Sequence, residues 1–216
     1  MPTNLFYEVQ LTDHNGNKIT SNGDFVVTAR NNPTKLAVYT RDLDLIDVST
    51  TKAVQIKSGV LSFGVPDTNA SVDVFGLTGD GYPFQIIGLV PGNTNFTIDL
   101  GQLRNQLVIP FTGAEYGTTA TDTGFPFLAN VLWDSINGGF NITTAGSSST
   151  LAIGISGTPA GLCAALATTA LGIIKTATST LAGAKGTGAN ILFTTVSPTV
   201  EKGYWYCPII RPIPAV

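Results

Sequence analysis

Few side chains in this sequence are of types that catalyse reactions, and the single histidine is the first to consider. His14 lies in the segment DHNGNK, whose Asp, Asn and Gly residues are typical of an exposed turn. A Ser-His-Asp or Cys-His arrangement needs a histidine beside its nucleophile, and neither cysteine lies in a recognisable nucleophile motif. We therefore interpret His14 as a turn residue and expect no nucleophilic catalysis.

The same turn carries oxygen-bearing side chains at alternate positions, as at the start of a calcium loop. Asp13, Asn15 and Asn17 have this spacing, and Asp24 falls at the twelfth position. However, Lys18 occupies the place where such a loop needs glycine, and no glutamate closes the loop. Because Asn and Asp also favour hairpin turns, we predict a turn without a metal ion.

A second group of carboxylates lies in the segment RDLDLID. Paired carboxylates can hydrolyse glycosidic bonds, but they need a cleft and one acid with a raised pKa. Here Arg41 precedes Asp42, Asp44 and Asp47, and the segment follows a predicted strand, so we interpret it as a solvated acidic loop. The second half of the chain offers only four further acids for such a pair: Glu115, Asp122, Asp134 and Glu201.

Neither the glycine-rich loop nor the two cysteines have the spacing of a ligand site. The segment GAKGTGAN, residues 183–190, lacks the Lys-Ser/Thr ending of a phosphate loop and enters no predicted helix, so we predict a flexible turn. Cys163 and Cys207 are far apart in sequence, and we expect two buried free thiols, with a disulfide as the alternative. No cofactor is expected.

Aromatic side chains gather near the C-terminal end of the sequence. Tyr204, Trp205 and Tyr206 are candidates for a sugar platform or an interface anchor, because Trp and Tyr dominate binding hot spots. The alternative is a strand that buries alternate residues. The segment CPIIRPIPAV has three prolines, which suit an extended tail lying across a neighbour. We therefore count Pro212 and Pro214 among the candidate contact residues.

The elements that would position these residues are short strands. In the first half, Leu5–Leu11 alternates, with Leu5, Tyr7, Val9 and Leu11 on one face, and an Asn-Gly turn follows. Further strands are predicted there at residues 25–29, 35–40, 53–56, 59–65, 71–77, 84–89, 96–100 and 107–111. In the second half, strands are predicted at residues 125–127, 130–136, 140–143, 151–155, 191–196 and 205–210.

One helix is predicted, over residues 159–171. Pro159 lies at its start and Gly172 just past its end, which is the usual asymmetry of helix termini. Its Leu162, Ala165, Leu166 and Thr169 would share one face. The predicted fold class is therefore all-β, with two small β-sandwich or barrel-like domains and at most one short helix.

Charge divides the chain and excludes several functions. Residues 1–110 hold seven Lys/Arg and ten Asp/Glu, whereas residues 111–216 hold four of each, and residues 135–174 hold none. We place domains at 1–108 and 109–216. The net charge of −3 without a basic cluster argues against nucleic-acid binding. The longest apolar run, Leu162–Ile174, is shorter than the roughly 20 residues of a membrane span, and the N-terminus lacks the pattern of a signal peptide.

Two long segments carry a resemblance to a known class of proteins. The segment PTKLAVYTRDLDLIDVSTTKAVQIKSGVLSFGVPDTNASVDVFGLTGDGYP, residues 33–83, is similar to a small β module of structural proteins of tailed bacteriophages. The segment LVIPFTGAEYGTTATDTGFPFLANVLWDSI, followed by TLAIGIS, resembles phage virion proteins with a neutral β-sandwich on the particle surface. The module occurs in capsid decoration proteins, head fibres and tail fibres.

This resemblance implies a non-enzymatic virion protein, assembled in the host cytoplasm. We expect a capsid decoration (cement) protein on the outer surface of the phage head, whose partners are the major capsid protein and copies of itself in a homotrimer. The expected contact residues are Leu5, Phe6 and Tyr7 of an N-terminal arm, together with Trp205, Tyr206, Pro212 and Pro214. The alternative is a receptor- or carbohydrate-binding module of a tail fibre or baseplate, which an exposed Trp133 or Trp205 would support.

Overall fold

A computed structural model describes residues 4–13, 15–39, 53–66, 70–98, 104–129 and 131–210. These residues are almost entirely in strands, turns and bends. The helical elements within them are two 3-10 turns, η1 (Gly113–Glu115) and η2 (Ser135–Asn137). The predicted all-β fold class is therefore confirmed.

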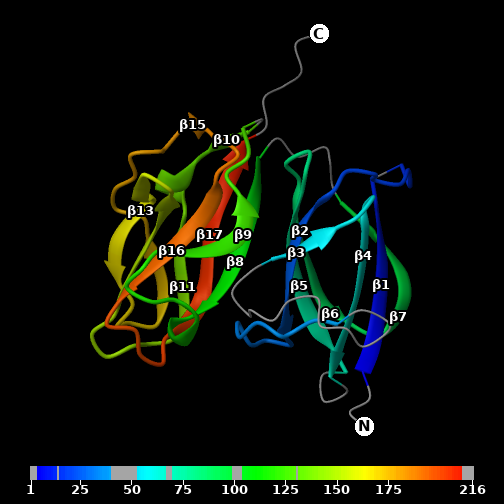
Figure 1. The fold of residues 1–216 in the computed structure, drawn as a ribbon, viewed down its shortest axis with the longest axis horizontal. Coiled ribbons are helices and arrows are strands. Elements are labelled where there is room, and N and C mark those ends of the chain that lie inside the picture. The colour runs from blue at the N-terminus through cyan, green and yellow to red at the C-terminus, as the bar shows by residue number, and fades with distance from the viewer. Residues whose placement is uncertain are drawn as a thin grey trace.

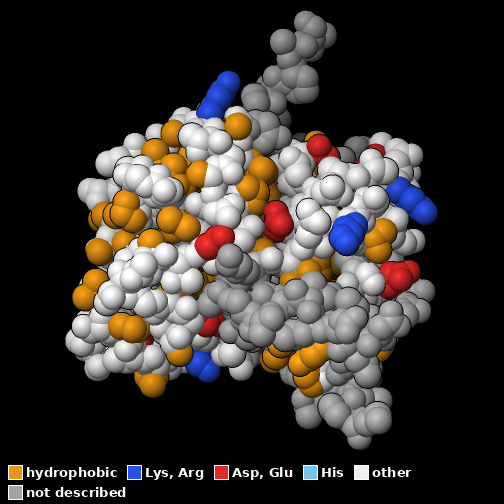
Figure 2. Space-filling view, viewed as in Figure 1, with side chains coloured by type: hydrophobic (Ala, Val, Ile, Leu, Met, Phe, Trp, Pro, Cys, Tyr) orange, Lys and Arg blue, Asp and Glu red, His pale blue; other side chains and the backbone are white. Residues whose placement is uncertain are grey.

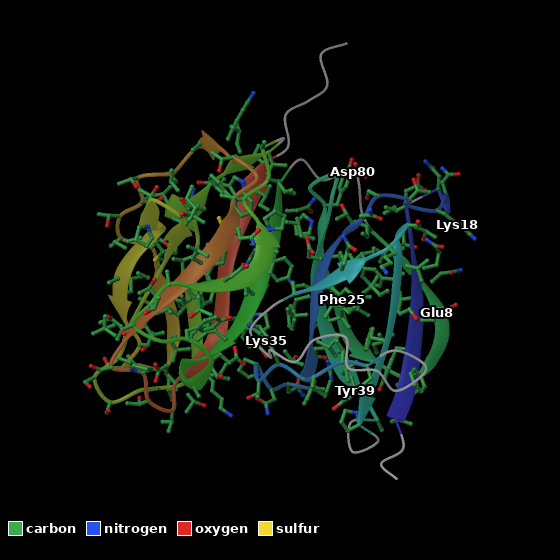
Figure 3. The ribbon with its side chains drawn as sticks, viewed as in Figure 1. Glu8, Lys18, Phe25, Lys35, Tyr39 and Asp80 are labelled. Atoms are coloured by element: carbon green, nitrogen blue, oxygen red, sulfur yellow. The ribbon has the colours of Figure 1, made fainter. Side chains whose placement is uncertain are left out.

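The N-terminal half is a sandwich of two sheets (Figure 1). The outer sheet has β1 (Asn4–Thr12) between an antiparallel β4 (Val60–Pro66) and a parallel β7 (Gly92–Thr97). The inner sheet is antiparallel and has the order β3 (Val54–Ile56), β2 (Gly23–Ala29), β5 (Val72–Thr78) and β6 (Pro83–Leu89). Alternate residues of β1 are buried against the inner sheet, where Phe25 lies between the two layers (Figure 3). This pattern matches the predicted alternation of residues 5–11.

The C-terminal half is a second sandwich. Its first sheet has β17 at the centre, with β8 on one side and β11, β10 and their neighbours on the other. The strands of this sheet are β8 (Arg104–Thr112), β10 (Leu132–Trp133), β11 (Gly139–Thr144), β14 (Gly172–Lys175), β15 (Ala184–Lys185) and β17 (Lys202–Ile210). The second sheet has the order β13 (Thr158–Ala167), β12 (Thr150–Ile155), β16 (Asn190–Val196) and β9 (Thr121–Pro126).

The two sandwiches share a core where their sheets meet. Every residue of β5 is buried, because one face of the strand packs into its own sandwich and the other faces β8. Val72 and Val74 belong to the N-terminal core, whereas Phe75 and Leu77 join the core of the C-terminal sandwich. The ring of Phe75 contacts that of Tyr204 at a centroid distance of 5.5 Å. At Phe75 and Leu77 the two sandwiches therefore share one apolar core.

Three sequence-based predictions differ from the structure. Residues 158–167 form strand β13 in place of the predicted helix. Its pairing with β12 is irregular, so buried and exposed residues do not alternate regularly along it. Leu162 and Cys163 are consequently both buried, and the apolar spacing imitates that of a helix. Residues 35–39 make only isolated bridges, at Lys35 and Tyr39. All nine residues of β8 pair with β17, so the C-terminal sandwich begins before the expected boundary at residue 108.

Candidate functional site

Three loops gather at one end of the C-terminal sandwich, at the lower left of Figure 1. They are residues 144–149 between β11 and β12, residues 168–171 between β13 and β14, and residues 196–200 at the end of β16 and before β17. Strand direction brings them together, because β11, β13 and β16 all run toward this end. None of these residues is charged. We call this surface the neutral loop end.

Large aliphatic side chains are exposed on the neutral loop end. Leu171 is 69% exposed, Val200 67% and Val196 54%. Ile173, on the adjacent edge strand β14, is 69% exposed. Figure 2 shows that charged side chains are sparse on the visible face of this sandwich, where hydrophobic and uncharged polar atoms predominate. Such a surface favours contact with another protein over solvation alone.

Hydrogen bonds hold the first two loops against each other. The hydroxyl groups of Ser149 and Thr168, both completely buried, share a hydrogen bond of 2.6 Å. The backbone N–H of Thr168 donates to the carbonyl of Ser149, and the N–H of Gly146 donates to the carbonyl of Thr168. The loops are therefore braced from inside, and their apolar side chains are presented on a fixed backbone.

A buried carboxylate fixes the third loop. Glu201 is 1% exposed, and its Oε2 accepts hydrogen bonds of 2.8 Å from both the backbone N–H and the hydroxyl of Thr199. The Glu201 carbonyl accepts a hydrogen bond from the N–H of Gly113 in η1. An added Cβ at Gly113 would collide with the Glu201 carboxylate, and one at Gly146 would collide with the Ser149 hydroxyl oxygen, so glycine is favoured at both positions. A hollow of about 310 Å³ lies beside this anchor, between Val200 and Ala114.

The predicted contact residues are placed differently from the expectation. Tyr7 and Trp205 are 1% and 0% exposed, so neither can serve as a surface anchor in the folded chain. Tyr7 instead stacks on Phe63 inside the N-terminal sandwich, at a centroid distance of 5.1 Å. Side chains alternate between the two faces of β1 and β17, and Tyr7 and Trp205 both lie on the inward face.

The remaining predicted contact residues are partly accessible or are not described. Leu5, Phe6 and Tyr206 are half-buried. Pro212 and Pro214 lie outside the described residues. Trp133 is buried with its indole N–H donating to the carbonyl of Leu128 at 3.2 Å, so the exposed tryptophan that would support sugar binding is absent at both Trp133 and Trp205.

The candidate calcium loop is a hydrogen-bonded turn, as predicted. Asp13 Oδ1 accepts hydrogen bonds from the backbone N–H groups of Asn15 and Asn17, and its Oδ2 accepts one from the Asn17 amide. The carboxylate is thus occupied within the turn. In the part of the chain that the structure describes, no three His, Cys, Asp or Glu side chains are grouped to hold a metal ion. Residues 14, 41, 42, 44 and 47 lie outside the described ranges.

Most of the carboxylates considered for catalysis are engaged by neighbouring groups. Glu115 pairs with the ammonium of Lys35 at 3.2 Å, and Asp134 accepts hydrogen bonds from the side-chain amide of Asn137. Asp122 accepts hydrogen bonds from the Asn190 amide and from the N–H of Gly124. These contacts are structural, and each fixes a turn or the junction between the sandwiches.

Among the described carboxyl groups, that of Asp24 has a clearly shifted pKa. Burial at the junction, and to a smaller extent the charge of Asp122, raise the pKa of Asp24 to about 6. A pair of acids with such a shift is a feature of glycosidases, but neither side chain lines the hollow at the junction or those beside β1, β6 and η1. We therefore assign the shift to the packing of the two sandwiches.

Both cysteines are free and buried, as predicted. Burial raises the pKa of the Cys163 thiol to about 11 and raises that of Cys207 well above its ordinary value. Neither sulfur therefore has the thiolate character of a nucleophile or a redox centre. The glycine-rich segment 183–190 is fixed by N–H groups that donate to the carbonyls of residues 127, 128 and 133.

Within the described ranges, no helix has the length and apolar character needed to cross a bilayer. No family model, curated protein or solved structure matches the chain. The role of the candidate site is therefore inferred from its residues and their contacts alone.

The sequence indicated only part of this site. The uncharged stretch from Ser135 to Ile174 includes two of the three loops, and its neutrality pointed to a contact surface. The third loop, residues 196–200, was missed. The sequence that could have indicated this loop is VSPTVE, residues 196–201. It has a proline and two exposed valines before Glu201, whose carboxylate accepts a hydrogen bond from the backbone of Thr199.

Proposed function

We propose that the chain is a non-enzymatic structural protein of a phage virion, most specifically a capsid decoration protein that binds the outer surface of the head. The observation that carries the proposal is the neutral loop end. It presents Leu171, Val196 and Val200 on loops without charge, and it is braced by buried hydrogen bonds.

A weak contact of this kind suits a repeated lattice. Each copy would bury a few aliphatic side chains and would not need to pair charges across the interface. Many copies on one shell, or three copies in a homotrimer, would add their contacts, so the assembled surface is bound far more tightly than an isolated subunit. Ligands that bind only the assembled shell also stabilise it by mass action.

The experiment adds purified protein to undecorated capsids of the cognate phage. Co-sedimentation measures binding, and the melting temperature of the shell measures stabilisation. Leu171→Glu and Val200→Glu each place a charge in the proposed contact and are expected to reduce retention at least tenfold. Ile136→Glu is the matched control, since Ile136 is an exposed isoleucine (45%) at the opposite end of β11.

Two results would refute the assignment. One is the absence of head binding together with binding to tails or host glycans, which would favour a receptor-binding module. The other is retention of the two loop variants at the level of the Ile136→Glu control. The mass of the protein in solution tests the trimer separately.

A further inference from the structure

A second surface feature lies at the junction of the two sandwiches and shares no residue with the neutral loop end. It is a hollow of about 440 Å³, which is within the range of small-ligand sites. One side is the outer face of the β8–β17–β11 sheet, including Tyr204, Tyr206 and Asn141. The other side comes from β5 and β6, including Gln85 and Ile87.

Two tyrosines form an aromatic floor. Tyr204 and Tyr206 are half-buried, and both extend from the outer face of β17, since the residues between and beside them are in the core. Tyr206 pairs across the sheet with Gly139, and a Cβ at Gly139 would lie 3.0 Å from the Tyr206 hydroxyl oxygen. The Tyr206 side chain therefore leans across the sheet over the glycine, and it is one of the residues that line the hollow.

Four side-chain amides surround this floor. They come from four different segments, and all are exposed: Asn31, Gln85, Gln106 and Asn141. In the described part of the chain, none of these four amide groups donates or accepts a hydrogen bond. Each offers two donors and one acceptor. Asn141 is the cross-strand neighbour of Tyr204, so an amide adjoins the aromatic floor directly.

The hollow has almost no free charge. Its one carboxylate, Asp73, is 3% exposed and accepts hydrogen bonds from Arg30 Nη1 at 2.8 Å and from the backbone N–H groups of Asn31 and Gly88. Among the described residues that line the hollow there is no lysine or arginine. The nearby guanidinium of Arg30 is already paired with Asp73, so the described lining offers no unpaired cation to an anionic ligand.

We propose that this hollow binds an uncharged saccharide. The flat C–H face of a sugar ring packs on a tyrosine ring, and sugar hydroxyls both donate and accept, as the amides do. The neutral lining matches an uncharged ligand, because no ionic group has to be desolvated without a partner. This hollow is a specific candidate site for the carbohydrate-binding alternative. It shares no residue with the neutral loop end, so saccharide binding and capsid decoration are compatible on one chain.

The test uses the full chain with four hexasaccharides. Maltohexaose, cellohexaose and hexa-N-acetylchitohexaose are neutral, and hexagalacturonate is the charged control. Saturation-transfer NMR detects binding, and calorimetric titration gives the affinity. At least one neutral probe is expected to bind, with hexagalacturonate at least tenfold weaker.

Variants locate the binding. Tyr206→Ala removes the aromatic ring and is expected to weaken binding of the neutral probe at least tenfold. Asn141→Ala removes an adjacent amide and is expected to weaken binding about threefold or more. Tyr206→Phe keeps the ring and should retain most of the affinity. Gln55→Ala is the matched control, because Gln55 is an exposed glutamine on β3, outside the hollow. Asn141 is exposed, so its variant tests the site without disturbing the core.

The proposal is overturned if no neutral hexasaccharide gives saturation transfer at millimolar concentration, if hexagalacturonate binds better, or if Asn141→Ala and Tyr206→Ala bind as Gln55→Ala does. Its failure is distinguishable from that of the decoration role. Asn141→Ala should still co-sediment with capsids, and Leu171→Glu should still bind the saccharide.

Discussion

The ammonium of Lys35 lies 3.2 Å from the carboxylate of Glu115, and the two residues belong to different sandwiches. Their side chains are 2% and 6% exposed, and Lys35 also donates to the hydroxyl of Tyr116. Figure 3 shows Lys35 between the two halves of the molecule. A charge pair is thus buried where the two sandwiches meet.

Breaking this pair should be costly because the remaining charge stays buried. Lys35→Met is expected to lower the free energy of unfolding by about 3–5 kcal/mol, whereas the double variant Lys35→Met/Glu115→Leu should be much closer to the parent. Urea unfolding measures both. Arg30→Met is the control and should cost about 1 kcal/mol or less, because Arg30 is 42% exposed on its side chain and Asp73 keeps two backbone donors. Equal losses in Lys35→Met and Arg30→Met would contradict the prediction.

Asp24 should make stability depend on pH. Its pKa is raised from 3.8 to about 6 in the folded chain, so the folded state favours the protonated acid. The stabilisation of the folded state by protonated Asp24 is present below about pH 4 and is lost as the pH rises through about 6. Asp24→Asn should therefore raise the free energy of unfolding at pH 7 by about 1–2 kcal/mol, after allowance for partial exposure, and flatten its dependence between these limits. Asp80→Asn, in an exposed turn, is the control variant.

The two buried tryptophans should respond differently to replacement by phenylalanine. Trp133→Phe loses the hydrogen bond to the Leu128 carbonyl, whereas the Trp205 N–H has no partner in the described part of the chain. Trp205→Phe removes that unsatisfied group, so its cost should be smaller than that of Trp133→Phe by about 1–2 kcal/mol. Thermal or urea unfolding compares them. A larger loss in Trp205→Phe would show that ring packing outweighs the unpaired donor.

The two thiols should be unreactive in the folded protein. Burial raises the pKa of both Cys163 and Cys207, and neither side chain is accessible. Ellman's reagent at pH 8 is expected to release no colour from the native chain and two equivalents in denaturant. A single equivalent in denaturant, or rapid reaction before unfolding, would be inconsistent with two buried free thiols.

Local sequence patterns predicted strands best where one face of the strand is buried. The alternation of β1 gave its position and its inward residues, because period-two patterns follow directly from strand geometry. Strand β13 was mistaken for a helix because its irregular pairing with β12 removed that alternation. The full burial of β5 also could not be predicted, since it depends on strand β8 of the second sandwich, which follows more than twenty positions later in the sequence.

The candidate sites show the same limit. Neutrality of the C-terminal half was visible in the sequence, but the meeting of residues 144–149, 168–171 and 196–200 follows from the direction of three strands. The sugar-platform hypothesis named Tyr204, Trp205 and Tyr206 together, but alternation on β17 buries Trp205 and turns only Tyr204 and Tyr206 outward. Long-range pairs such as Lys35 and Glu115, 80 residues apart, have no local signal.

Strand β17 begins at Lys202, two residues after Val200, and runs without interruption to Ile210. At roughly 3.3 Å per residue, its last residue is about 26 Å from its first. If the neutral loop end is the surface that contacts the shell, Ile210 would lie at the opposite end of the C-terminal sandwich from that contact. Under the proposed decoration role, β17 would therefore act as a spacer that holds Ile210 away from the shell.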